Sequence, residues 1–79
     1  MLLKFTSPTC QPCKELNRQL KEGTGIGEQL ELEEVDVTRN PDIVMQYGVR
    51  SVPTLVNVDT GEKIVGLEPI LDYLRKQAA

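Results

Sequence analysis

Two cysteines, Cys10 and Cys13, stand on either side of Gln11 and Pro12. A cysteine thiolate is the nucleophile in disulfide exchange. The two-residue spacing brings Cys13 within bonding reach of Cys10 one helical turn later. Lys14 places a cation beside the pair. This pattern predicts redox chemistry at the two cysteines, with Pro12 and Lys14 as supporting residues.

A predicted strand and a predicted helix meet at the cysteines. Residues 2–6 form a short, mostly apolar run, which predicts a buried strand. After Cys10, apolar residues recur at helical spacing as far as Gly23, which predicts a helix. Cys10 would therefore lie at a helix N-terminus, where unpaired N–H groups and a partial positive charge stabilise a thiolate. Pro12 is tolerated there because first-turn N–H groups have no helical partner.

The rest of the chain alternates between strand and helix patterns. Further strands are predicted over residues 30–37, 54–58 and 62–65, and further helices beginning at Asn40-Pro41 and at Pro69. Residues 23–27 are predicted as a loop, and Gly61 as the turn residue of a hairpin. The order βαβαββα predicts an α/β fold with a four-stranded mixed sheet. Its first two strands are parallel, because a helix connects them, and its last two are antiparallel.

Length and composition exclude several classes of function. Seventy-nine residues are expected to form a single domain over residues 1–79. The chain has no His, which excludes His-based acid–base catalysis and a Cys/His zinc finger. Two cysteines complete a structural zinc site only if two chains share it. We therefore expect no metal site and favour redox chemistry.

Charge and hydropathy narrow the expected partners and location. The net charge of −3 disfavours nucleic acid as a partner, because phosphate binding needs a basic surface. No apolar run is long enough to cross a membrane, and the N-terminus lacks the features of a signal peptide. A cytoplasmic protein is expected. Residues 28–42 carry six acidic side chains against one Arg, a local net charge of −5 that needs an explanation.

Several further motifs accompany the cysteines. They are Phe5-Thr6-Ser7-Pro8-Thr9 before Cys10, Val35-Asp36-Val37, Asn40-Pro41, Tyr47-Gly48-Val49-Arg50-Ser51-Val52-Pro53-Thr54, and Gly66. With them the chain resembles the thioredoxin superfamily over nearly its whole length. It is most similar to the short, glutaredoxin-sized thioredoxins of archaea, bacteria and phages. The resemblance implies that Cys10 attacks a substrate disulfide, that Cys13 resolves the mixed disulfide, and that a cis peptide bond precedes Pro53.

Departures from the family pattern bear on the substrate. Thr9 stands where thioredoxins usually carry Trp, and Gln11 replaces Gly. Glutaredoxins hold a glutathione carboxylate at the start of the last helix. Here Glu68 would repel that carboxylate, and Pro69 lacks an N–H donor. We therefore expect protein disulfides as substrates, docked by residues around the cysteines: Thr9, Gln11, Val52, Gly66 and Leu67. A structural role for Leu67 is an open alternative.

The same resemblance points to two further charged residues. Thioredoxins bury an Asp beneath the cysteines near a Lys on the neighbouring strand. At the matching positions this chain has Lys4 and Glu34. We expect a partly buried pair of reversed polarity, because one buried charge alone is costly. In this pair Glu34 would relay a proton through water, or Lys4 would stabilise the Cys13 thiolate. An exposed or unrelated pair is the alternative.

The resemblance also implies partners. No bound cofactor is expected; a Cys10–Cys13 disulfide would receive electrons from NADPH through a thioredoxin-reductase-type enzyme. Ribonucleotide reductase is a natural recipient, and a monomer is expected. A glutathione-coupled glutaredoxin and a non-catalytic binding module are the alternatives.

The first strand and helix of larger thioredoxins have no counterpart in this sequence, so residues 30–37 should form a sheet edge, where acidic side chains discourage association.

Overall fold

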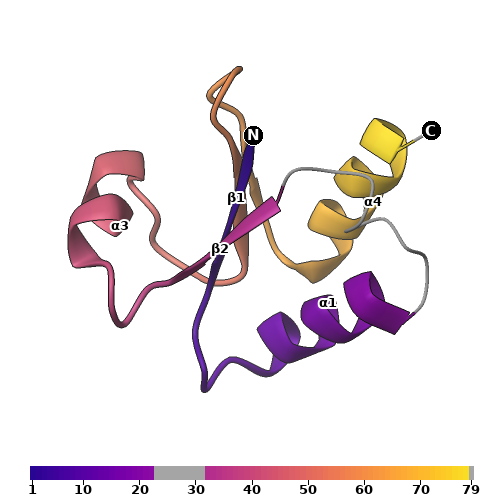
Figure 1. The fold of residues 1–79 in the computed structure, drawn as a ribbon, viewed down its shortest axis with the longest axis horizontal. Helices are drawn as coiled ribbons and strands as arrows, with labels where there is room; N and C mark the ends of the chain where they lie inside the picture. Colours follow the sequence, from indigo (N-terminus) through magenta and orange to yellow (C-terminus); the bar gives the residue numbers. More distant parts are fainter. Residues whose placement is uncertain (23–31, 79) are drawn as a thin grey trace.

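A four-stranded sheet forms the centre of the computed structural model, which describes residues 1–22 and 32–78 (Figure 1). Its strand order is β2-β1-β3-β4. The strands are β1 (Leu2–Thr6), β2 (Leu32–Asp36), β3 (Thr54–Asn57) and β4 (Lys63–Val65). β1 pairs in parallel with β2 and antiparallel with β3, and β3 pairs antiparallel with β4. The predicted mixed α/β sheet is confirmed.

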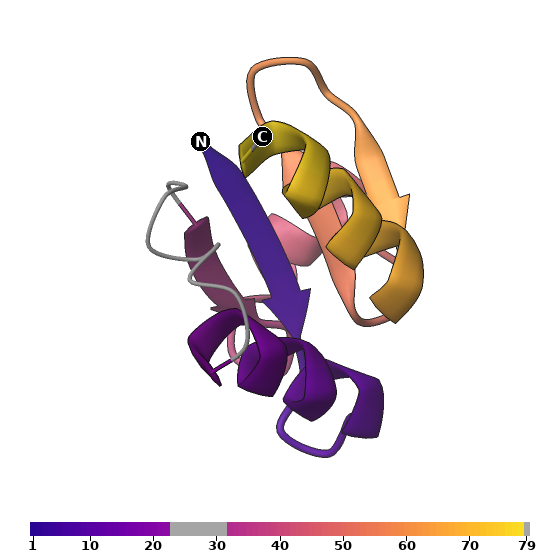
Figure 2. The ribbon, with the colours of Figure 1, turned by 90° about the vertical axis from the view of Figure 1, so that its right-hand side faces the viewer.

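Helices cover both faces of this sheet. They are α1 (Gln11–Glu22), α3 (Pro41–Tyr47) and α4 (Leu67–Ala78). Figure 1 shows α3 on one side of the strands and α1 and α4 on the other. The view turned by 90° shows the end of β1 leading toward the start of α1 (Figure 2). Because β1 is covered on both faces, all five of its side chains are buried, as its short apolar run predicts.

Each face of the sheet has its own apolar cluster. Seven buried residues form the cluster under α1 and α4: Leu2, Leu16, Leu20, Leu55, Ile70, Leu71 and Leu74. Four form the cluster under α3: Leu3, Phe5, Val35 and Val56. Burial of these side chains is the main stabilising contribution to the fold.

α3 begins and ends where its sequence predicts. Pro41 occupies the first turn, where its missing N–H is no loss, and Gly48 ends the helix in the left-handed conformation at φ 64°. Asn40, which was expected to cap the helix, makes no side-chain cap hydrogen bond. Its side-chain amide instead donates to the Asp36 carbonyl oxygen at 2.9 Å, which ties the start of α3 to the end of β2.

Several predicted boundaries shift. β2 covers residues 32–36 of the predicted 30–37, and residue 30 lies outside the described residues, as does the predicted loop at 23–27. β3 ends at Asn57, and β4 begins at Lys63. Gly61 has φ 79°, as the predicted turn requires. α4 begins at Leu67, two residues before the predicted start at Pro69. Pro69 is accommodated there because N–H groups in a first turn have no partner within the helix.

The position of β2 confirms the predicted edge strand. β2 pairs with β1 and is the outermost strand on its side of the sheet. Its Glu33 and Glu34 side chains are exposed. Charged side chains on an edge strand disfavour edge-to-edge pairing, so the position of these acidic residues fits a protective role.

Candidate active site

The two cysteines form a disulfide at the start of α1. Cys10 directly precedes the helix and Cys13 lies in its first turn, with their Cα atoms 5.2 Å apart. Cys10 is partly exposed, whereas Cys13 is only 1% exposed. A substrate can therefore reach the sulfur of Cys10 and not that of Cys13.

The backbone of α1 contributes to the electrostatics of Cys10. The N–H of Cys13 donates toward the Cys10 sulfur at 3.2 Å. This N–H belongs to the first helical turn, whose donors have no partner within the helix. In the reduced protein the same donor and the positive end of the helix dipole favour a Cys10 thiolate. Lys14 is exposed in the same turn.

A loop before β3 lies against the cysteines from the other side. The Val52–Pro53 peptide bond is cis, as the resemblance implies. The Val52 carbonyl oxygen lies 3.6 Å from the Cys10 sulfur. The N–H of Gly66 donates to the Pro53 carbonyl oxygen at 3.0 Å, which brings Gly66 beside this loop. Of the predicted docking residues, Val52 therefore lies at Cys10, and Gly66 lies beside the same loop.

The remaining predicted docking residues differ in exposure. Thr9 and Gln11, the chain neighbours of Cys10, are exposed. Leu67 is half-buried and packs against the apolar cluster under α1 and α4. Leu67 therefore has a structural contact in addition to any docking role.

A group of polar side chains lies beneath Cys13. We call Lys4, Thr6, Asn17 and Glu34 the polar network. The Lys4 ammonium donates to Asn17 Oδ1, and Asn17 Nδ2 donates to Glu34 Oε1 at 3.3 Å. The Thr6 hydroxyl donates to the same Glu34 oxygen at 3.1 Å. β1, α1 and β2 each contribute to the network.

The expected Lys4–Glu34 pair needs one correction. The two residues are partners in the β1–β2 register, and Lys4 is buried at 9% exposure, but Glu34 is exposed. The connection between their side chains runs through Asn17. Asn17 was missed from the sequence, although it follows Cys13 by four residues and so shares its face of α1.

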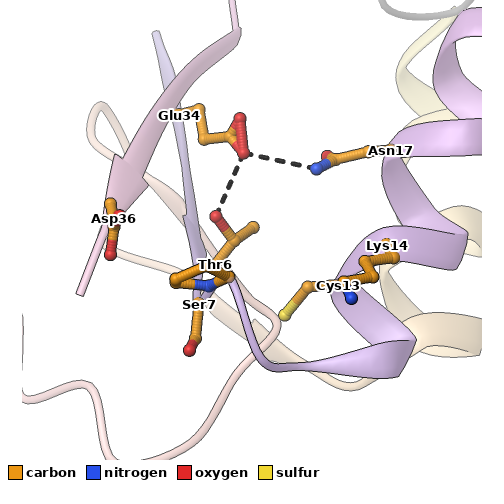
Figure 3. Close-up of a pocket in the computed structure, with 8 residues that line it drawn as sticks. Thr6, Ser7, Cys13, Lys14, Asn17, Glu34 and Asp36 are labelled. Atoms are coloured by element: carbon orange, nitrogen blue, oxygen red, sulfur yellow. Dashed lines mark hydrogen bonds between the residues drawn. The ribbon is translucent and has the colours of Figure 1, made fainter. Parts of the chain in front are cut away.

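The polar network borders a pocket of about 410 Å³ that reaches Cys13 (Figure 3). Its lining includes Thr6, Cys13, Lys14, Asn17, Glu34 and Asp36. Figure 3 shows Glu34 and Asn17 pointing toward each other across the space between β2 and α1, while Thr6 reaches the same carboxylate from β1. The buried sulfur of Cys13 and an exposed carboxylate thus share one pocket.

Comparisons with known proteins agree with this geometry. The family model described as Thioredoxin matches residues 1–74. The SPbeta prophage-derived thioredoxin-like protein YosR of Bacillus subtilis is 36% identical, with 96% of this chain and 95% of that protein covered. The chain belongs to the thioredoxin family.

Two further comparisons extend this result. A thioredoxin of Bacillus subtilis is 36% identical over 87% of this chain and 70% of its own length. The crystal structure of mitochondrial thioredoxin 3 from Saccharomyces cerevisiae, in its oxidised form, superposes with a TM-score of 0.77 at 28% identity, covering 98% of this chain and 74% of that one. With its Cys10–Cys13 disulfide, this thioredoxin-family protein is a thiol–disulfide oxidoreductase.

Two carboxylates of this thioredoxin-family protein have lowered pKa values. Hydrogen bonds from the Thr38 side chain and backbone, with a smaller contribution from Arg39, hold the pKa of Asp36 below its usual range. The pKa of Glu15 falls to about 2, first because Arg18 donates to it and then because Gln19 does. Asp36 is at the pocket edge, so its lowered pKa makes it a weak proton acceptor there.

Metal-binding clusters and membrane-spanning helices are both absent from the described residues of this thioredoxin-family protein. Across residues 1–22 and 32–78, no three His, Cys, Asp or Glu side chains lie together as a metal site requires. Within the same part of the chain, no helix is both long and apolar enough to cross a membrane.

Proposed function

We propose that this protein, as a single domain over residues 1–79, reduces disulfides in protein substrates. The observation that carries the proposal is the difference in exposure between the two sulfurs. Cys10 is partly exposed beside the Val52 carbonyl, whereas Cys13 is 1% exposed behind it. This arrangement supports Cys10 as the attacking cysteine and Cys13 as the resolving one.

The reaction takes two exchange steps. The Cys10 thiolate attacks one substrate sulfur, so that a mixed disulfide forms and the other substrate sulfur leaves as a thiolate. Cys13 then attacks Cys10, which breaks the mixed disulfide and releases the second substrate thiolate. The substrate gains two electrons and the protein becomes the Cys10–Cys13 disulfide. The two thiolates released take up protons according to their pKa values.

The surroundings of Cys10 favour a polypeptide as substrate. The carbonyl oxygen of Val52 and the exposed side chains of Thr9 and Gln11 offer polar contacts to an extended chain. Apolar contacts come from Val52 and Leu67, which are both half-buried. At the start of α4, Glu68 is exposed and would repel the carboxylate of glutathione, which disfavours the glutaredoxin alternative.

The electron source and location follow as parts of the same proposal. Electrons reach the disulfide from NADPH through a thioredoxin-reductase-type enzyme, and ribonucleotide reductase is one candidate recipient. We propose a cytoplasmic monomer without nucleic-acid or membrane partners. The acidic net charge of −3 supports the exclusion of nucleic acid.

Insulin reduction in two parallel assays tests the proposal. One assay supplies NADPH and thioredoxin reductase, and the other supplies glutathione, glutathione reductase and NADPH. We expect turnover in the first assay and little in the second. Turnover in the second assay alone would favour the glutaredoxin alternative, and activity in neither would favour a binding module or a dedicated partner.

A further inference from the structure

The loop that contacts Cys10 is held by hydrogen bonds at its two ends. Residues 49–53 connect α3 to β3 (Figure 1). The N–H of Val49 and the carbonyl oxygen of Pro53 each take part in a backbone hydrogen bond to a neighbouring segment. The carbonyl oxygen of Val52, which lies 3.6 Å from the Cys10 sulfur, belongs to the stretch between these ends. What holds that stretch in place therefore decides how the loop meets Cys10.

A threonine hydroxyl holds the middle of the loop. Thr54, the first residue of β3, donates from its hydroxyl to the Ser51 carbonyl oxygen at 2.7 Å. Among the residues that the structure describes, this is the only N–H or O–H donor to the backbone of residues 50–52. The hydrogen-bonded support closest to Val52 on its N-terminal side is therefore this side chain.

Thr54 is itself held rigidly. It is 2% exposed, and β3 pairs it with Phe5 of β1 on one side and with Val65 of β4 on the other. A β-branched side chain also has few accessible rotamers. The hydroxyl is therefore fixed relative to the sheet, and a group on a strand positions its neighbours more precisely than a group on a loop does.

A hydroxyl at this position is not required by packing. Cross-strand partners share one face of a sheet, so Thr54 lies on the same face as Phe5 and the apolar cluster under α3. Valine would fill nearly the same space without a polar group to remove from water. What the hydroxyl adds at this position is its hydrogen bond to the Ser51 carbonyl oxygen.

We propose that Thr54 is a positioning residue for substrate docking. Its hydroxyl holds the Ser51 carbonyl, which keeps the backbone of the next residue, Val52, beside Cys10. An extended protein substrate then meets a preformed surface and does not have to order the loop on binding, which would cost binding free energy. The disulfide exchange itself does not involve Thr54. This inference rests on the proposed reduction of protein disulfides.

Single-turnover oxidation by insulin measures docking and exchange separately. The protein is reduced, separated from the reductant and mixed with increasing excesses of insulin. The Cys10–Cys13 disulfide is then followed by mass spectrometry after acid quenching and alkylation. The insulin concentration that gives the half-maximal rate reports docking, and the maximal rate reports exchange. A parallel reaction with dithiobis(nitrobenzoic acid), a small disulfide without a polypeptide chain, reports exchange alone.

Thr54→Val is the main variant, because valine keeps the shape of threonine and removes the hydroxyl. Ser51 is exposed, so water can bond to its carbonyl oxygen, and we expect the variant to fold. The half-maximal insulin concentration should rise about fivefold, the equivalent of one ordinary hydrogen bond. The maximal rate and the rate with dithiobis(nitrobenzoic acid) should stay within about twofold of the wild type, an allowance smaller than one such bond.

Thr54→Ser separates positioning from packing. Serine keeps the hydroxyl and loses a buried methyl group, so we expect wild-type docking together with a lower urea midpoint than that of Thr54→Val. A purely structural role predicts instead that docking weakens as stability falls. The inference is overturned if Thr54→Ser impairs docking as much as Thr54→Val does, or if Thr54→Val docks like the wild type.

Tyr73→Phe is the matched control for the loss of a hydroxyl. The Tyr73 hydroxyl accepts from Asn57 Nδ2 at 2.8 Å, at the opposite end of β3 from Thr54. We expect wild-type docking and exchange in this variant, and a docking defect equal to that of Thr54→Val would overturn the inference. A wild-type protein that insulin does not oxidise would overturn the proposed function and this inference with it. A reactive wild type with an unimpaired Thr54→Val would overturn the positioning role alone.

Discussion

The two faces of the sheet are built differently. The face under α3 is lined mainly by apolar buried side chains, among them Phe5, although Thr54, the cross-strand partner of Phe5, is buried there as well. The face under α1 and α4 also has an apolar cluster, which includes Leu2, but β1 contributes Lys4 and Thr6 to this face. The polar half of this face is the half that lies beneath Cys13 (Figure 3).

Because of this difference, we expect the α3 face to contribute mainly to stability and the polar half of the other face to contribute to reactivity. An apolar face gains free energy from each side chain that it removes from water. A buried lysine contributes little to the free energy of folding, because the cost of removing its charge from water offsets the energy of its interactions. Lys4 and Thr6 are therefore better explained by the reaction at the adjacent cysteine. Changes on the α3 face should alter stability, and changes in the polar half should alter redox kinetics.

The largest expected effects fall on the cysteines themselves. Cys10→Ser and Cys13→Ser should each lower insulin reduction by at least about three orders of magnitude, as the loss of a nucleophile does. Cys13→Ser should accumulate a mixed disulfide at Cys10, visible by mass spectrometry, because nothing resolves it. Cys10→Ser should form little, since Cys13 is 1% exposed. Equal trapping by both variants would contradict the assigned roles.

A second pair of variants compares the two faces directly. Phe5 is fully buried under α3, and Phe5→Ala should lower the free energy of unfolding by about 3–5 kcal/mol. Lys4→Met should change it by no more than about 1 kcal/mol, because methionine fills the site and the hydrogen-bond partner Asn17 is only partly buried.

Urea unfolding of the oxidised proteins measures both changes. The comparison between the faces fails if Lys4→Met destabilises as much as Phe5→Ala. Insulin reduction at neutral pH, measured well below the unfolding midpoint, should show the opposite order, with the larger loss of rate in Lys4→Met.

A smaller effect is expected at the end of α3. Gly48 has φ 64°, and a Cβ there would lie 3.0 Å from the Lys63 ammonium nitrogen. Gly48→Ala should therefore lower the free energy of unfolding by about 1–2 kcal/mol. Redox kinetics measured below the unfolding midpoint should stay at the wild-type level. A redox defect in this variant would show that the α3 face also serves the reaction.

The smallest effect concerns the exposed side of α1. Arg18 and Gln19 lower the pKa of Glu15 from 4.5 to about 2. A carboxylate with a lowered folded-state pKa stabilises the fold above its unfolded pKa, and this contribution is lost as pH falls from about 4.5 toward 2. Arg18→Gln should weaken that pH dependence in urea unfolding and raise the Glu15 pKa measured by NMR.

Arg75→Gln is the control for the Glu15 prediction. It removes the same charge from the exposed side of α4, where Arg75 pairs with Asp72. The Glu15 pKa should not move in this variant. If it rises as much as in Arg18→Gln, the direct Arg18 contact is not its cause.

Local patterns predicted most of the elements. The apolar run of residues 2–6, Pro41 at the start of α3 and Gly48 at its end each depend on the chain nearby. The spacing of Cys10 and Cys13 likewise predicted the disulfide and its place at a helix N-terminus. Boundaries were less predictable. Pro69 fits any first-turn position, so it did not show that α4 begins at Leu67.

The polar network could be predicted only in part from the sequence. The resemblance indicated Lys4 and Glu34, but the contact between them depends on Asn17, which lies 13 residues from one and 17 from the other. Only the parallel register of β1 and β2 and the position of α1 over them bring the three together.

The sequence by itself determined the redox pair, the order of elements and the acidic edge strand, because these follow from spacing and composition along the chain. The tertiary structure alone decided which cysteine sulfur is exposed. It also decided which carboxylate shares a pocket with the buried sulfur of Cys13. Exposure and side-chain contact depend on how distant segments pack, and packing is not a property of any one segment.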